Sequence, residues 1–346
     1  MSVVTAGFML GVSEFALRLR PHPHDNIVLH KLEDNLKKNH LESFAQSIVN
    51  DDEIFWRLAP NVRFPDDAPH IRGLVSNAAG LREDHEIPFE KPGGEVRVLF
   101  LGDSCTFGFG VLHHESIVEC TERLLNARFP AVHTECINAG VPGYTIMQGW
   151  RYFERAGLKY QPDIVISSFG WNDVRAWSTL SDVERYERFK KSTPPGCLAR
   201  SEVCWSIWHL VAGYKKPPEQ DHPIPRVSTG ETAEILQRIN TVAKTVGASF
   251  LPMVWPLLDN FTKGDPLWLN EYQKVTYRFG SEQLTFGSRR EPAVIDLIPA
   301  IQEALKVHSL TNLFIDGVHT QARANEIIAE EITRKIAAWY EDHTHS

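Results

Sequence analysis

A serine early in the chain and a histidine near its end both stand in settings typical of acyl-transfer chemistry. Ser104 lies in the run Gly102-Asp103-Ser104, directly after a short apolar segment, and His319 follows Asp316 by three residues across a glycine. A carboxylate at that spacing reaches the Nδ1–H of the histidine and fixes its tautomer, which leaves Nε2 to take a proton from a serine. These residues predict a nucleophile, its base and the acid that orients the base, each of which also has an ordinary structural explanation.

The structural explanations come from turns and helix caps. A serine before a helix is a common N-cap, and an Asp-Gly-x-His run is an ordinary surface turn. A flavodoxin-like nucleotide binder also places serine, threonine and glycine in a phosphate-binding loop after its first strand. That alternative leaves Asp316 and His319 without a role.

Two further loops supply hydrogen-bond donors of the kind that stabilise an oxyanion. The loop 138–145 contains Gly143, whose backbone N–H can approach a ligand closely, with Gly140 as the second choice in the same block. The loop 170–173 contains Asn172, whose carboxamide can donate to a developing negative charge. We expect Asp173 to lock this second loop by accepting backbone N–H bonds.

The elements between these loops predict an α/β fold. Apolar runs indicate buried parallel strands at 96–101 and 163–169, and further strands are expected at 133–138, 249–254 and 293–297. Helical patterns separate or follow them at about 116–128, 145–157, 231–246 and 321–339. This alternation predicts a three-layer α/β/α sandwich around a mostly parallel sheet, with the functional loops gathered at the carboxyl ends of the strands.

The order of these motifs resembles the signature of the SGNH (GDSL-type) hydrolase family over roughly residues 96–340. The resemblance implies a flavodoxin-like sandwich in which Ser104 is the nucleophile and Asp316 and His319 complete the triad. It also implies that Gly143 and Asn172 donate to the oxyanion together with the Ser104 N–H. Two departures from the family pattern remove no chemical group: Cys105 replaces a larger apolar residue and Thr320 replaces a proline.

Residues beside these loops are expected to contact the substrate. They are Trp171, Asp103 and Tyr144. Trp171 lies inside a loop with Asn172 and would line the acyl or alcohol pocket. His113 and His114 lie near Ser104 in sequence but lack an acid three residues before them, so we expect them at the surface.

The chain outside the periodic part divides into two irregular segments. Residues 1–95 are expected to form an N-terminal appendage, with one helix at 41–49, that wraps a hydrolase domain at 96–346. Residues 175–229 are rich in proline and tryptophan and directly follow the third strand, so they are expected to form a cap over the active edge.

The N-terminal segment also bears on localisation. The approach to the first strand is similar to that of bacterial family members with an N-terminal membrane anchor, notably at 55–58 and 80–82. Residues 3–17 are mostly apolar but too short to span a membrane, and they predict either an anchor remnant or a docked helix. An extracytoplasmic or membrane-associated protein is therefore favoured over a cytoplasmic one.

Composition excludes several function classes. The net charge of −8 offers no basic field for nucleic acid. The five cysteines form no CxxC or Cys/His cluster, so we expect neither a metal nor an organic cofactor, and Cys197 and Cys204 could form a disulfide in an oxidising compartment. The sequence does not predict an oligomeric state.

These observations together predict a carboxyl-ester hydrolase acting on a small or carbohydrate-linked ester through an acyl-enzyme. A deacetylase is the variant that the family resemblance suggests. A competing interpretation is an acyltransferase, in which the same acyl-enzyme passes its acyl group to a sugar hydroxyl. Two interpretations of a different class are the flavodoxin-like nucleotide binder and a binding module whose triad is inactive.

Overall fold

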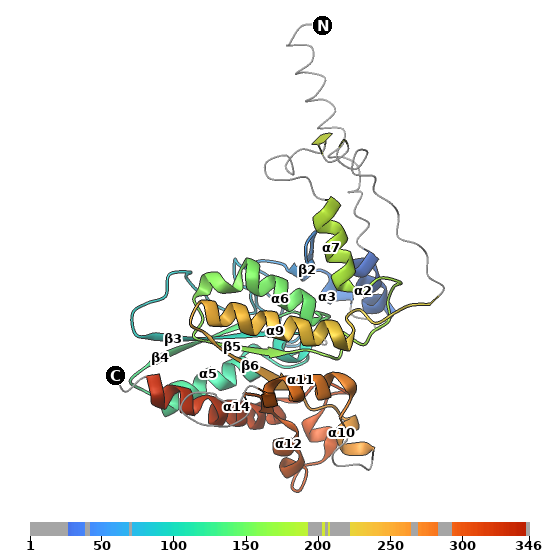
Figure 1. Cartoon of the computed structure of the whole chain (residues 1–346). Coiled ribbons are helices and arrows are strands. Elements are labelled where there is room, and N and C mark those ends of the chain that lie inside the picture. Colours follow the sequence, from blue (N-terminus) through green and yellow to red (C-terminus); the bar gives the residue numbers. More distant parts are fainter. Residues whose placement is uncertain are drawn as a thin grey trace.

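A parallel five-stranded sheet forms the centre of the protein in the computed structural model, which describes residues 27–38, 42–68, 71–192, 203–204, 207, 222–263, 269–282 and 293–343 (Figure 1). The strands lie in the order β4-β3-β5-β6-β7. Their bounds are Glu95–Gly102 (β3), His133–Gly140 (β4), Ile164–Ser168 (β5), Ser249–Val254 (β6) and Ile295–Asp296 (β7). Every strand pair is parallel, as a sheet built from βα units requires.

Helices cover both faces of this sheet. Helices α6 (Ile146–Arg155) and α9 (Thr229–Thr245) pack on one face, and α5 (Ile117–Arg128) and α14 (Ala322–His343) pack on the other (Figure 1). Successive side chains of β3 therefore enter two different apolar cores, with Leu99 in one and Phe100 in the other. The predicted three-layer sandwich with flavodoxin-like strand order is confirmed.

The order of strands places an open crevice at a defined point. Strand β4 lies on one side of β3. After β4 the chain crosses over β3, and β5 lies on the other side. Loops that follow β3 and β5 therefore diverge at their carboxyl ends, which is where open α/β sheets bind ligands. These are the loops that contain Ser104 and Asn172.

The segment before the sheet differs in part from the sequence-based expectation. The helix expected at 41–49 ends early, as α3 (Glu42–Ala45), because the Ser47 hydroxyl and N–H both bind the carbonyl of Phe44. The following residues instead form a hairpin of β1 (Ile48–Asp51) and β2 (Phe55–Leu58). A helix that we did not predict, α2 (Ile27–Lys38), precedes them.

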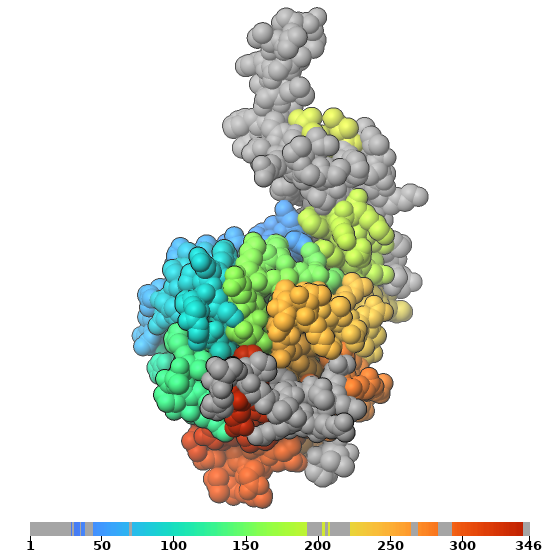
Figure 2. Space-filling model, turned by 60° about the vertical axis from the view of Figure 1, so that its left-hand side comes forward, coloured from blue at the N-terminus to red at the C-terminus, as the bar shows by residue number. Residues whose placement is uncertain are grey.

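This N-terminal segment is tied to the main domain. The indole N–H of Trp56 donates to the Pro142 carbonyl at 3.1 Å, and the Tyr144 hydroxyl donates to the Trp56 carbonyl at 2.8 Å. Figure 2 shows the later part of the segment (cyan) lying beside α6 (green), which in turn lies beside α9 (gold). Residues 27–95 thus share a core with the sheet, and the domain boundary at residue 95 stays a prediction.

The expected cap is described in part. It contains α7 (Asp182–Ser192), and its two ends are joined at a neck where Ser178 pairs with Ile224 and the Arg226 N–H donates to the Arg175 carbonyl at 3.0 Å. Most of residues 193–221 lies outside the described part, including Cys197, so the predicted disulfide is not tested.

The remaining elements are short or peripheral. They are α4 (Ser104–Phe107), η1 (His113–Glu115), η2 (Gly157–Tyr160), α10 (Asp259–Thr262), α11 (Glu271–Glu282), α12 (Ile298–Ala304) and α13 (Leu310–Leu313). Among the residues described, no helix combines the length and apolar character needed to cross a bilayer. The apolar run at 3–17, and with it the expected membrane association, lies outside them.

Candidate active site

Ser104 is the first residue of α4 and lies at the carboxyl end of strand β3. Asp103 caps this short helix by accepting the Cys105 N–H at 2.9 Å, and Gly108 ends it in the left-handed conformation at φ +82°. The turn is tight, because a Cβ at Gly102 would lie 2.0 Å from the Thr106 hydroxyl oxygen. The strand-to-helix turn thus fixes the serine at the sheet edge.

His319 reaches this serine from the loop before α14. Its Nε2 lies 2.8 Å from the Ser104 Oγ, and its Nδ1 lies 2.7 Å from Oδ2 of Asp316. The other carboxylate oxygen of Asp316 accepts the backbone N–H groups of Val318 and His319, both at 2.8 Å. The structure therefore brings the three predicted residues into one hydrogen-bonded chain.

The electrostatics of this chain keep Asp316 ionised. Burial acts to raise the pKa of its carboxyl, but the hydrogen bond and charge of His319 and two backbone N–H groups outweigh burial and lower the pKa to about 2. The carboxylate can then hold a proton on Nδ1 and leave Nε2 as the acceptor that faces Ser104.

A separate set of contacts holds the histidine loop against the serine loop. The Cys105 thiol lies 3.6 Å from the Val318 carbonyl, and the Trp255 indole N–H donates to the same carbonyl at 2.8 Å. The loop closes on itself through an Ile315 N–H bond to the His319 carbonyl at 2.8 Å. The cysteine that departs from the family pattern is thus a buried contact between the two loops.

The two predicted oxyanion donors, Gly143 and Asn172, line the same pocket as Ser104 and His319. Gly143 has φ +82° and lines the same pocket as Ser104 and His319, whereas Gly140 is buried against the backbone of α4 and uses its N–H to bind Asn138. Asn172 also lines the pocket. The geometry therefore favours Gly143 over Gly140 as the donor.

The carboxamide of Asn172 is held by two acceptors. Its Nδ2 lies 3.2 Å from both Asp103 Oδ2 and the Tyr144 carbonyl. Asp173 links the two donor loops, because it accepts the N–H of Ile146 at 3.1 Å and that of Gly170 at 2.8 Å. The expected locking contact of Asp173 is therefore present, although burial raises the pKa of this carboxyl to about 7.

Arg226, at the neck of the cap, hydrogen-bonds to the loop that contains Gly143. Its guanidinium donates to the Gly143 carbonyl at 2.7 Å, to Gln148 at 2.7 Å and to Asp182 at 3.0 Å. Arg226 and Asp182 are both almost fully buried, so this ion pair connects the cap to the donor loop in a water-poor environment. Sequence reasoning did not single out either residue.

A pocket of about 350 Å³ opens at Ser104 and His319. Its apolar wall combines residues of three segments, namely Leu32, Leu36, Phe44, Phe109, Trp171 and Trp177. The Phe109 ring packs on the His319 imidazole with 4.9 Å between centroids. Trp171 thus lies where it was predicted, whereas the contribution of α2 and α3 could not be predicted because nothing in their sequence links them to Ser104.

Two expected substrate contacts lie elsewhere. The Tyr144 side chain is buried with its hydroxyl bound to Trp56, and Asp103 is buried as the cap of α4. Neither lines the pocket at Ser104, so both act on the site through the residues that they hold.

Comparison with known proteins supports the family suggested by these motifs. Residues 100–276 match the GDSL-like lipase/acylhydrolase family, a range that includes Ser104, Gly143 and Asn172 and ends before Asp316 and His319. No curated protein matches the sequence of this chain.

Solved structures give more distant similarities. LAE5, an alpha/beta hydrolase enzyme from the metagenome of Lake Arreo, has 15% identity and a TM-score of 0.46, covering 72% of this chain and 98% of that one. Axe2, an acetylxylan esterase from Geobacillus stearothermophilus, has 20% identity and a TM-score of 0.46, covering 70% and 94%.

Proposed function

This chain is an ester hydrolase that belongs to the GDSL-like lipase/acylhydrolase family, and we propose that it works through an acyl-enzyme on Ser104. The observation that carries the proposal is the 2.8 Å contact between His319 Nε2 and Ser104 Oγ, with Asp316 on the far side of the ring. This is the arrangement in which a histidine takes a proton from a serine and returns it to a leaving group.

The reaction has two halves. As Ser104 Oγ bonds to the ester carbonyl carbon, His319 Nε2 takes the hydroxyl proton and the carbonyl oxygen becomes an oxyanion. Collapse of this intermediate breaks the bond to the alcohol, which receives the proton from His319. Water then attacks the acyl-serine with the same base, which releases the carboxylic acid and restores Ser104.

The oxyanion is placed among three donors, namely the N–H groups of Ser104 and Gly143 and the carboxamide of Asn172. To bind the oxyanion, the Asn172 carboxamide redirects one N–H group away from Asp103 or from the Tyr144 carbonyl. Both of these hydrogen bonds are 3.2 Å long, at the upper end of the usual range, so redirecting one costs little free energy. Each donor of this kind contributes roughly a hundred- to a thousandfold to turnover.

The pocket favours an apolar acyl group larger than acetyl. Its wall offers leucine, phenylalanine and tryptophan side chains for burial, with Arg175 as a hydrogen-bond donor beside them. We therefore propose an alkyl or aryl ester as substrate, with an acetylated carbohydrate as the competing possibility.

The test combines active-site labelling with an ester panel. A fluorophosphonate should label the purified protein once per chain, and Ser104→Ala should abolish both labelling and hydrolysis. Ser309→Ala, which removes an exposed hydroxyl that contacts Thr311, is the matched control and should retain both. Hydrolysis by Ser104→Ala at the wild-type rate would exclude the acyl-enzyme.

The panel runs from acetyl to long acyl esters, with and without a sugar acceptor. Higher kcat/KM for butyryl or benzoyl esters than for acetyl esters would support the assigned acyl class, and the reverse order would exclude it. Acyl-sugar in place of free acid would show transfer rather than hydrolysis.

A further inference from the structure

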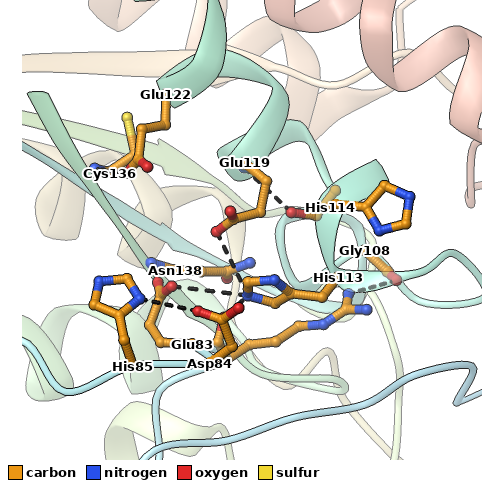
Figure 3. A network of polar contacts seen from close by, with 12 residues as sticks. Glu83, Asp84, His85, Gly108, His113, His114, Glu119, Glu122, Cys136 and Asn138 are labelled. Carbon is orange, nitrogen blue, oxygen red and sulfur yellow. Dashed lines mark hydrogen bonds and ion pairs between the residues drawn. The ribbon is translucent and has the colours of Figure 1, made fainter. Parts of the chain in front are cut away.

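A second polar cluster lies away from Ser104, between the segment before β3, the helix η1 and the start of α5 (Figure 3). Its most buried member is Glu83, whose side chain has no exposed surface. One carboxylate oxygen of Glu83 accepts the Asn138 N–H at 2.6 Å. The other, Oε2, is buried and has no hydrogen-bond partner, so an unsatisfied polar atom faces the cluster.

The imidazole of His113 lies next to Glu83 Oε2. We expected it at the surface, but only 13% of its side chain is exposed, because η1 turns it inward between two acidic residues (Figure 3). Its Nε2 lies 3.8 Å from Glu83 Oε2, 3.5 Å from Glu119 Oε1 and 3.0 Å from the Arg82 carbonyl oxygen. Four potential metal ligands therefore surround one small volume.

The nearest fixed cation does not neutralise the cluster. Arg82 is buried, but its guanidinium turns away and donates to the carbonyls of Phe107, Gly108 and Val111. Of the charged side chains described, His113 is the one that lies within 4 Å of both carboxylates.

We propose that Glu83, His113 and Glu119 bind a divalent transition-metal cation, with the Arg82 carbonyl as an additional ligand. The three side-chain ligand atoms all lie within 4.8 Å of one another. Atoms that each lie about 2.1 Å from one zinc ion are separated by roughly 3.0–3.5 Å. The contacts of His113 Nε2 at 3.5 and 3.8 Å therefore need to shorten by less than about 1 Å, and the two carboxylate oxygens need to approach each other by up to about 1.5 Å. One imidazole with two carboxylates suits Zn²⁺ or Mn²⁺ better than Ca²⁺ or Mg²⁺.

The ion has a route to this site and a structural effect there. Glu119 keeps 22% of its side chain exposed, so the cluster is reached from the surface. A bound ion joins the segment at Glu83 to η1 and α5. These elements flank the loop that carries Phe109 against the His319 ring, so the ion would stabilise the wall of the acyl pocket without touching the substrate.

Metal binding is measured on the full-length protein after chelator treatment and dialysis. Calorimetric titration with Zn²⁺ should show one saturable site per chain, and the melting temperature should rise by a few degrees at a hundredfold excess over Kd. Zinc-edge X-ray absorption should show nitrogen and oxygen ligands without sulfur. Mn²⁺ is titrated in the same way.

The variants decide where the ion binds. His113→Gln should lower the affinity at least a hundredfold, and Glu119→Gln, at a partly exposed position, should do the same if the first variant does not fold. His114→Gln changes the exposed neighbouring histidine and should bind like the wild type. Ser104→Ala should also bind normally, which separates this test from that of the proposed function.

Two results would overturn the proposal. One is the absence of a saturable site for both metals. The other is equal affinity in the wild type and a folded His113→Gln or Glu119→Gln variant, because adventitious binding to other histidines would then account for the uptake.

Discussion

Replacing Asp316 by asparagine tests how the geometry of the histidine loop produces activity. The asparagine carbonyl oxygen can still accept the backbone N–H groups of Val318 and His319, so the loop should keep its shape. Its NH₂ group, however, replaces the oxygen that lies 2.7 Å from His319 Nδ1. Two donors would then face each other, and the ring would move its proton to Nε2, which points at Ser104.

The expected loss follows from this tautomer change. A histidine whose Nε2 already carries a proton cannot deprotonate Ser104, and comparable substitutions in serine hydrolases cost about 10⁴ in kcat. That factor corresponds to roughly 5.5 kcal/mol in the activation free energy. KM should change little, because asparagine keeps the size of Asp316 where that side chain lines the pocket.

Asp316→Ala is the informative companion variant. About half of the Asp316 side chain is exposed (49%), so water can occupy the space that alanine leaves and accept the Nδ1 proton. We therefore expect Asp316→Ala to retain about tenfold more activity than Asp316→Asn. Steady-state hydrolysis of one activated ester by both purified variants, with circular dichroism as a control for folding, measures the difference. An alanine variant less active than the asparagine variant would refute the tautomer argument.

Four further outcomes follow from the site. Asn172→Ala should lower kcat roughly a hundred- to a thousandfold at unchanged KM, measured by ester hydrolysis, whereas a loss confined to KM would contradict an oxyanion role. Gly143→Ala should cost about 1–2 kcal/mol in urea unfolding, because φ is +82° and the new Cβ lies 3.0 Å from the Trp56 ring; an unchanged midpoint would be inconsistent with this. Arg226→Ala should cost about 3–5 kcal/mol in the same assay, because it leaves a buried carboxylate without its partner, and a loss below 1 kcal/mol would argue against the ion pair. The pKa of Asp316 falls from 3.8 to about 2 on folding, so its ionised form stabilises the folded state fully above pH 4, and this stabilisation is lost as the pH falls toward 2. Solvent screening limits the stabilisation to about 1 kcal/mol. Melting temperatures of the wild type and Asp316→Asn should therefore converge between pH 4 and pH 2.

The sequence predicted the parallel sheet mainly because β3 and β5 contain continuous apolar runs. The strand β3 has only buried residues after Glu95, which is the pattern of a strand covered on both faces. The loops at its edge could be predicted for the same reason, since Ser104 and Asn172 follow such runs directly.

Other parts of the site depend on contacts between distant segments that no local pattern indicates. The apolar face of α2 places Leu32 and Leu36 at the pocket beside Ser104. The sequence of α2 alone does not predict that this helix packs there. His113 was misjudged because its environment comes from Glu83, 30 positions earlier, and from the turn of η1. The hairpin of β1 and β2 was missed since its strands have four residues each and mixed polarity.

The joined ends of the cap have a consequence for how this enzyme can change. Because Ser178 pairs with Ile224, and Arg226 binds both Asp182 and the Gly143 carbonyl, both ends of the cap are fixed by residues outside the stretch 183–223. The entropic cost of closing a loop grows only logarithmically with its length, so segments of very different size can be accommodated at this point. Selection, or an engineer, can therefore exchange residues 183–223 for a shorter loop or a foreign module while Ser104 and His319 keep their positions.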